Sequence, residues 1–264
     1  MSAGTVEAAG VQLAYEEHGS GPAVVLIHGI ASTRSVWQET IEALGPEVRA
    51  VAYDRRAYGE SGAPESYRGT TVEEQAEDTV ELIRSLDAAP AVLCGHGLGA
   101  TIALDLLQRH AELIRGAAVI EPPLLPLAAT GNEVMSQVRE RVTEAAREGG
   151  PRAAVRAFIE GSGAEVVERL GPEREEAALS ATAGFAADVA ASASWEVSKR
   201  RLARIDAPVV ALTGSTSAPV WGEISRSLVE IVPGATLREA AGGHFLQLDA
   251  PADVAAAARE LALG

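Results

Sequence analysis

The stretch Leu93-Cys94-Gly95-His96-Gly97-Leu98-Gly99-Ala100 joins a predicted strand to a predicted helix. The strand is the short apolar run 91–94, and the helix is 98–110, where apolar residues recur at mixed helical spacing. Three glycines at alternate positions allow a tight turn and a close approach of backbone segments. This strand–turn–helix unit is the starting point for the fold of the chain.

The flanking sequence repeats the same alternation of strand and helix. Further apolar runs, rich in β-branched residues and typical of buried parallel strands, occupy 23–28, 49–54, 117–120 and 209–213. Helices are predicted at 71–86, where Thr71 and Glu74 form a capping-box pattern, and at 251–263, which begins with a proline. The alternation predicts an α/β fold with a mostly parallel sheet flanked by helices.

The segment 122–204 interrupts this rhythm. It contains no convincing strand, and helical patterns cover 132–148, 151–159 and 172–197. Helices inserted between two strands are expected to lie over the strand ends, where open α/β sheets bind ligands. We therefore predict one domain, with a core formed by 1–121 and 205–264 and a helical cap formed by 122–204.

Composition excludes several classes of protein. The chain has 264 residues, is 47% hydrophobic and carries a formal net charge of −15, so nucleic acid and anionic membranes are unfavourable partners. Its single cysteine excludes an internal disulfide framework and a cysteine-based zinc site. No signal peptide and no membrane-spanning run is visible, which predicts a cytoplasmic protein, and the abundance of Ala, Gly and Arg is typical of a bacterial GC-rich genome. No phosphate loop, dinucleotide fingerprint or metal-ligand cluster occurs, so no cofactor and no metal are expected.

Four motifs in order resemble the α/β-hydrolase superfamily over nearly the whole chain. The glycine framework at 95–99 is similar to the nucleophile elbow G-x-S-x-G. His28-Gly29-Ile30 resembles the oxyanion-hole turn, and 53–62 resembles the strand end and loop that follow it. Gly242-Gly243-His244 resembles the loop that carries the catalytic histidine. The resemblance implies an α/β-hydrolase fold with an inserted helical cap.

The chain departs from this pattern where the family carries its nucleophile, because Gly97 has no side chain there. Cys94, three residues earlier in the strand, is interpreted as a small buried hydrophobic residue. His96 is interpreted as structural. Glycine adopts the backbone conformation of this turn without strain, so the fold is expected to survive the loss of a nucleophile.

The resemblance also implies the remaining site residues. The backbone N–H groups of Ile30 and Leu98 would form the oxyanion hole, and His244 would be the base. The loop after strand 209–213 has no carboxylate, so Glu121, which directly follows strand 117–120, is the candidate acid that orients His244. Asp206 and Asp249 are weaker candidates. The candidate residues for the wall of the pocket are His28, His96, Trp37, Trp195, Trp221 and Phe245.

Three functions remain open. In the first, His244 and Glu121 act as a general base without a covalent step, on a small carbonyl, ester or lactone-type substrate, by direct water activation, elimination, rearrangement or cyclisation. In the second, the chain is a Gly97 variant of a serine esterase, lactonase or thioesterase. In the third, it is a non-catalytic binder of small molecules. A mostly apolar cap favours a neutral or apolar substrate, and the sequence carries no signal for an oligomeric state.

Overall fold

Strands from both ends of the chain form one sheet in the computed structural model, which describes residues 2–163 and 165–264. Within these residues the sheet has eight strands in the order β1-β2-β4-β3-β5-β6-β7-β8. The strands are β1 (Ser2–Ala8), β2 (Val11–His18), β3 (Ala23–Ile27), β4 (Arg49–Tyr53), β5 (Ala91–His96), β6 (Ile114–Ile120), β7 (Val209–Gly214) and β8 (Thr236–Ala240). β2 pairs antiparallel with β1 and β4, and every other neighbouring pair is parallel. The predicted α/β fold with a mostly parallel sheet is confirmed.

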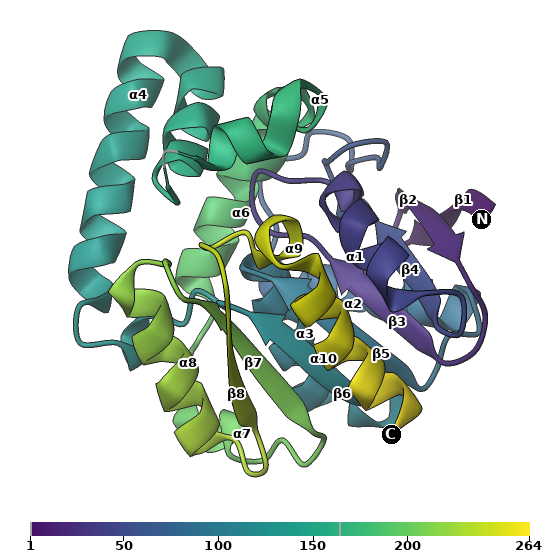
Figure 1. Cartoon of the computed structure of the whole chain (residues 1–264). Helices are drawn as coiled ribbons and strands as arrows, with labels where there is room; N and C mark the ends of the chain where they lie inside the picture. Colours follow the sequence, from purple (N-terminus) through teal and green to yellow (C-terminus); the bar gives the residue numbers. More distant parts are fainter. Residues whose placement is uncertain (1, 164) are drawn as a thin grey trace.

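Helices cover both faces of this sheet (Figure 1). They are α1 (Gln38–Leu44), α2 (Val72–Ser85), α3 (Leu98–Arg109), α4 (Gly131–Glu160), α5 (Val166–Ser180), α6 (Thr182–Ser194), α7 (Lys199–Leu202), α8 (Pro219–Ile231), α9 (Leu246–Asp249) and α10 (Pro251–Leu263). Short 3₁₀ turns occur at Arg34–Trp37, Ala111–Leu113 and Leu125–Leu127.

The continuous apolar runs of the central strands follow from this double cover. Because side chains alternate along a strand, Val25 and Ile27 of β3 belong to the core beneath α2, α3 and α8. Val24 and Leu26 of the same strand belong to the core beneath α1 and α10. A strand with helices on both faces therefore needs apolar residues at every position.

Of the helices between β6 and β7, α4, α5 and α6 gather over one end of the sheet, with α4 as the outermost element (Figure 1). Within α4, the helix bends at Gly150, which has a φ of 78° and precedes Pro151, so the predicted break between two helices is present. The predicted single helix 172–197 was wrong. It is divided at Ala181, whose ψ of 44° is not helical, and the chain turns there to bury the α6 side chains Phe185 and Asp188. The division into a core and a cap at 122 and 204 stays a prediction.

The five strands and the helices of the core that the sequence indicated are present, with bounds shifted by a few residues. Thr71 caps α2, because its Oγ1 accepts a hydrogen bond from the N–H of Glu74 at 3.0 Å. The sequence analysis missed the two edge strands, β1 and β8, which carry many exposed side chains, and β2, which pairs with β1 and has a half-buried second half. Such strands lack the continuous apolar run that identifies a central strand.

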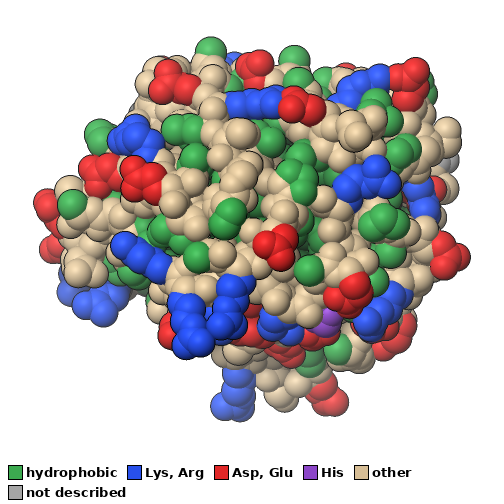
Figure 2. All heavy atoms as spheres, turned by 90° about the horizontal axis from the view of Figure 1, so that it is seen from below, with side chains coloured by type: hydrophobic (Ala, Val, Ile, Leu, Met, Phe, Trp, Pro, Cys, Tyr) green, Lys and Arg blue, Asp and Glu red, His purple; other side chains and the backbone are tan. Residues whose placement is uncertain are grey.

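None of the helices in 2–163 and 165–264 combines the length and the apolar character needed to cross a bilayer. Figure 2 shows the face of the molecule seen from below, where acidic and basic side chains lie next to one another between scattered hydrophobic groups. The negative net charge of the chain is therefore not concentrated into a single acidic field on this face.

Candidate active site

The turn between β5 and α3 depends on its glycines for two different reasons. Gly97, at the tip, has a φ of 54° and a ψ of −118°, a conformation that residues with a side chain adopt only under strain. Gly95 and Gly99 have no such requirement, but a Cβ atom at Gly99 would overlap the backbone of Ile27 and one at Gly95 would overlap that of Gly99. Gly99 therefore lets the start of α3 pack against β3, Gly95 lets it pack against the end of β5, and Gly97 sets the direction of the turn.

The tip of the turn faces open space and His244. A Cβ atom built on Gly97 would lie 3.9 Å from Nε2 of His244 and 3.9 Å from Cα of Gly29, with no closer neighbour. Any group at this tip, whether a side chain, a water molecule or a substrate atom, thus lies within reach of the imidazole.

His244 and Glu121 form the central contact of the site. Nδ1 of His244 lies 2.6 Å from Oε2 of Glu121, and both side chains are largely buried. The other carboxylate oxygen, Oε1, accepts the N–H of Gly214 at 2.8 Å and the hydroxyl of Thr213 at 2.9 Å. Glu121 itself has a φ of 42°, a left-handed conformation unusual for a residue with a side chain, directly after β6. This turn of the backbone aims the carboxylate across the end of β7 towards the histidine loop.

Aromatic rings hold the imidazole of His244 in place. The ring of Trp221, from α8, stacks on it with centroids 4.5 Å apart and an interplanar angle of 20°. The ring of His96 lies on another side, at 4.6 Å. The loop before His244 is fixed by Asp249, whose Oδ2 accepts the N–H of Gly243 at 2.8 Å. Asp249 therefore supports the loop and does not contact the imidazole as an orienting acid, while Asp206 lies exposed on the surface.

His96 is buried without hydrogen-bond partners for either ring nitrogen among the described groups. Burial lowers the pKa of the His96 imidazole well below the ordinary value for histidine, and the neighbouring His244 lowers it further. The ring is therefore neutral at pH 7.

Two backbone N–H groups beside the tip have no acceptor in the described part of the protein. They belong to Ile30, in the turn after β3, and to Leu98, the first residue of α3. The first N–H groups of a helix have no intrahelical acceptor, and the helix dipole makes this end attractive to negative charge. Ile30, Gly97, Leu98 and His244 line the same cavity.

This cavity has a volume of about 230 Å³ and is walled mainly by apolar side chains. It lies where the loops after β3, β5, β6, β7 and β8 meet α4, α6 and α8, as expected for a ligand site in an α/β sheet. Its apolar lining includes Leu125, Val134, Met135, Val138, Val142, Phe158, Val189, Val220, Trp221 and Phe245, and its polar lining includes Gln137, Arg141, Ser162 and Ser192.

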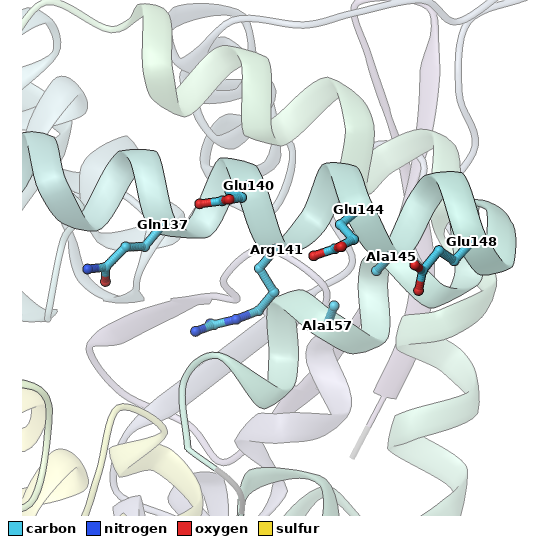
Figure 3. A pocket seen from close by; sticks show the side chains of 7 residues that line it. All are labelled: Gln137, Glu140, Arg141, Glu144, Ala145, Glu148 and Ala157. Carbon is cyan, nitrogen blue, oxygen red and sulfur yellow. The ribbon is translucent and has the colours of Figure 1, made fainter.

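A second hollow, of about 480 Å³, lies along α4 and contains none of the site residues named from the sequence. Figure 3 shows its charged lining, with Glu140, Arg141, Glu144 and Glu148 projecting from the first half of α4 and Ala157 from the second. Unlike the cavity at Gly97, this hollow is not lined by His244, Ile30 or Leu98. Gln137, Arg141 and Ala157 line both hollows, so the outer one lies next to the cavity at Gly97.

The structure separates the candidate pocket residues into two groups. His96, Trp221 and Phe245 line the cavity. Trp37, Trp195 and His28 do not, and these three predictions are corrected. Trp37 is fully buried against α1 and α10, and Trp195 is buried beside α3, where its indole N–H donates to Asp105 at 3.1 Å. His28, predicted as part of the pocket wall, is fully buried and does not belong to the lining of the cavity.

Arginines 55 and 56 also differ from expectation. From the sequence, Asp54 is predicted to hold its own loop by pairing with Arg55 or Arg56, but it accepts from the main-chain N–H of Arg34 at 2.8 Å and pairs with the Arg34 side chain. Arg55 pairs instead with Asp188, and Arg56 with Asp78. These partners come from α6 and α2, and sequence spacing gives no sign of contacts between such distant segments.

Cys94 lies in β5 with its side chain fully buried in the core, as expected. Burial raises the pKa of its thiol to about 12, so almost no thiolate is present near neutral pH. Within the described residues, no group of three or more His, Cys, Asp or Glu side chains is arranged to hold a metal ion.

The sheet order, the glycine turn and the cavity at the carboxyl ends of the strands define the class. The chain belongs to the alpha/beta hydrolase family, whose model matches residues 24–257. Among solved structures it is similar to a thermophilic esterase from Thermogutta terrifontis, with a TM-score of 0.81, 24% identity and coverage of 98% of this chain and 97% of that one. At this level of identity the likeness concerns the fold.

Two curated relatives share part or most of the sequence. An uncharacterized hydrolase of Bacillus subtilis is 33% identical over 131 residues, which is 50% of this chain and 48% of the relative. A putative non-heme chloroperoxidase of Synechocystis is 28% identical over 253 residues, covering 89% of this chain and 91% of the relative. The chain spans about half or less of the length of the first curated relatives that it matches.

Proposed function

We propose that this chain is an enzyme that acts on a small organic carbonyl, ester or lactone-type substrate without a side-chain nucleophile. His244 and Glu121 serve as the general base pair, and the N–H groups of Ile30 and Leu98 bind the developing oxyanion. The observation that carries this proposal is the open space at Gly97, which faces Nε2 of His244. A water molecule or a substrate carbon acid at this place meets the base directly.

The protonation state of His244 follows from its partner. Because Oε2 of Glu121 accepts a hydrogen bond from Nδ1, Nδ1 carries the proton and Nε2 has a free lone pair. Nε2 takes a proton from water, and the resulting hydroxide attacks the substrate carbonyl. When the tetrahedral intermediate collapses, the leaving alkoxide takes this proton back from Nε2. The same base supports elimination, rearrangement or cyclisation if it removes a proton from carbon.

The general base and the oxyanion donors are expected to lower the activation barrier by comparable amounts. A positioned general base accelerates a reaction by about 10²–10⁴. Loss of one oxyanion donor costs roughly 2.7–4 kcal/mol in other enzymes, and backbone donors do not depend on a side chain at position 97. Since a factor of ten corresponds to about 1.4 kcal/mol, the base contributes about 2.7–5.5 kcal/mol, which is similar to the contribution of one donor.

The open space at Gly97 also favours a second function, that of a serine enzyme. A Cβ atom at position 97 meets nothing within 3.9 Å, and a hydroxyl on it would reach towards Nε2 of His244. This fits a serine esterase, lactonase or thioesterase that is present here as its Gly97 form.

The experiment that separates the two compares the protein, Gly97→Ser and His244→Ala on a panel of activated esters and lactones. Turnover by the unmodified protein that disappears in His244→Ala supports the base mechanism. Negligible turnover that rises strongly in Gly97→Ser, with an initial burst, supports the serine enzyme instead. Tight binding of the same compounds with no turnover in any form would contradict both and favour a binder.

A further inference from the structure

The guanidinium group of Arg55 is buried behind the turn that carries Ile30. Its Nε donates to the carbonyl oxygen of His28 at 2.9 Å, and its Nη2 donates to the carbonyl oxygen of Gly29 at 2.8 Å. The same group binds Oδ2 of Asp188 at 2.7 Å and Oε1 of Gln75 at 2.5 Å. All of these contacts are buried, so water does not compete for them.

His28 reinforces this hold on the Gly29 carbonyl. Its Nε2 accepts the main-chain N–H of Arg55 at 3.0 Å, so the proton lies on Nδ1, which donates to the Gly29 oxygen at 2.9 Å. Burial and the charge of Arg55 lower the pKa of His28 well below its ordinary value, which keeps the ring in this neutral state.

The Gly29 carbonyl and the Ile30 N–H belong to one planar peptide group, and in a trans peptide they point in opposite directions. Because the Gly29 carbonyl is held pointing towards Arg55, the Ile30 N–H is held pointing in the opposite direction. Ile30 lines the cavity beside Gly97, and its N–H has no acceptor among the described groups.

We infer that Arg55, held by Asp188, is a positioning residue that keeps the Ile30 N–H aimed at the oxygen of the bound substrate. The inference rests on the proposed function, since it concerns one of the two oxyanion donors. Arg55 does not touch the substrate; it acts through the Gly29–Ile30 peptide group.

Asp188 extends this support to the inserted segment. It lies on α6, and its Oδ1 accepts from Nε2 of Gln75 at 2.7 Å, while Oδ2 accepts from Arg55 and from the hydroxyl of Tyr58, each at 2.7 Å. The hydrogen bond from Arg55 to Asp188 and the one from Arg55 to the Gly29 carbonyl thus connect α6 to the peptide group of the proposed oxyanion hole. Correct docking of α6 and correct aim of the Ile30 N–H are therefore linked.

Arg56 provides a matched control. It is as deeply buried as Arg55 and makes a bidentate pair with Asp78, at 2.6 and 2.7 Å, together with a contact to Glu74. Both partners lie on α2, and Arg56 donates no hydrogen bond to the turn at 28–30. Arg55→Lys and Arg56→Lys each keep the charge and remove the fork of donors.

The first measurement is the amide resonance of Ile30 in protein labelled with ¹⁵N-isoleucine, assigned by its loss in Ile30→Leu. We expect this resonance to shift or broaden in Arg55→Lys and to stay unchanged in Arg56→Lys. Asp188→Asn, which keeps the shape of the side chain, is expected to act in the same direction and serves if Arg55→Lys does not fold. An Ile30 resonance that is the same in the Arg55, Asp188 and Arg56 variants overturns the inference, whatever the turnover.

The second measurement separates kcat from KM on the best ester or lactone of the panel. Misaligning one donor is expected to lower kcat by about 10- to 100-fold in Arg55→Lys, with little change in KM. An equal loss in Arg56→Lys, or an unchanged kcat beside a perturbed Ile30 resonance, overturns the inference. Turnover that is unchanged in His244→Ala contradicts the proposed function instead. In that case the Ile30 resonance alone tests whether Arg55 positions the Gly29–Ile30 peptide group.

Discussion

Nδ1 of His244 lies 2.6 Å from Oε2 of Glu121, although 123 positions separate the two residues in the chain. The second carboxylate oxygen of Glu121 accepts two hydrogen bonds, from Thr213 and Gly214. The carboxylate is therefore held at both oxygens before any substrate binds.

This arrangement predicts a large effect of Glu121→Gln. The hydroxyl of Thr213 and the N–H of Gly214 need an acceptor, so the amide oxygen takes the place of Oε1 and the NH₂ group faces His244. The imidazole must then accept at Nδ1 and carry its proton on Nε2, where it no longer acts as a base. We expect kcat to fall by about 10²–10⁴ at pH 7. Thr213→Val, which removes one support of the same carboxylate, is the control and should cost far less; equal losses would contradict this reasoning.

The glycine turn predicts opposite outcomes for two neighbouring substitutions. Gly97→Ala places a methyl group in open space, and its cost is the backbone strain of about 1–3 kcal/mol. Gly99→Ala places the same group against the Ile27 backbone and requires β3 or α3 to move. Urea unfolding should therefore show a folded Gly97→Ala protein with moderately reduced stability and a much less stable Gly99→Ala protein. The reverse order would refute this assignment of the two glycines.

Stability is expected to fall on acidification because of His28 and His96. Burial lowers the pKa of both rings below about 6.5, the ordinary value for histidine, so the unfolded chain binds protons that the folded protein does not. Their contribution is complete above pH 6.5 and is lost as the pH falls below it, by up to about 1.4 kcal/mol per pH unit for each ring. Urea unfolding between pH 8 and pH 5 measures this slope. His96→Asn should reduce it, and an undiminished slope would show that His96 does not contribute.

Cys94 is expected to be chemically inert in the folded protein. Its thiol is fully buried and its pKa is raised to about 12, so a disulfide reagent such as DTNB should react only after unfolding. Cys94→Ala should keep turnover near that of the unmodified protein, since the thiol lies in the core on the α1 and α10 face of the sheet. Rapid labelling that abolishes turnover would argue for a nucleophile at this position.

The central strands could be predicted because burial on both faces leaves a continuous apolar run, as in 23–27. The edge strand β8 could not, because its exposed residues Thr236, Leu237 and Glu239 resemble a loop in composition. The bend of α4 was signalled by Gly149-Gly150-Pro151, whereas the break at Ala181 has no such local signal. That break depends on how α6 packs against the core, and a local sequence pattern carries no information on this packing.

Some residues of the candidate site could also be predicted from the sequence, and others could not. His244 and Glu121 were each named from the segment around them, and the structure places them in hydrogen-bond contact. Thr213 and Gly214 were assigned only to a strand and its end, because nothing local shows that they face Glu121. The pairing of Arg55 with Asp188 spans 133 positions, and it depends on how α6 packs, so no spacing rule reveals it. Trp37 and Trp195 show the opposite error, since a large aromatic side chain serves a core as well as a pocket.

The buried Arg55–Asp188 pair also determines which parts of the chain open together. Pulling α6 away from the sheet would leave the Arg55 charge without its counter-ion in an apolar interior, which costs several kcal/mol. Local opening of α6 is therefore tied to loss of the central structure, and its amide protons should exchange with solvent almost as slowly as those of β5. The first half of α4 has mostly exposed side chains and no comparable anchor among its described contacts. Proteases are thus expected to cut first in α4, while α6 remains protected as part of the core.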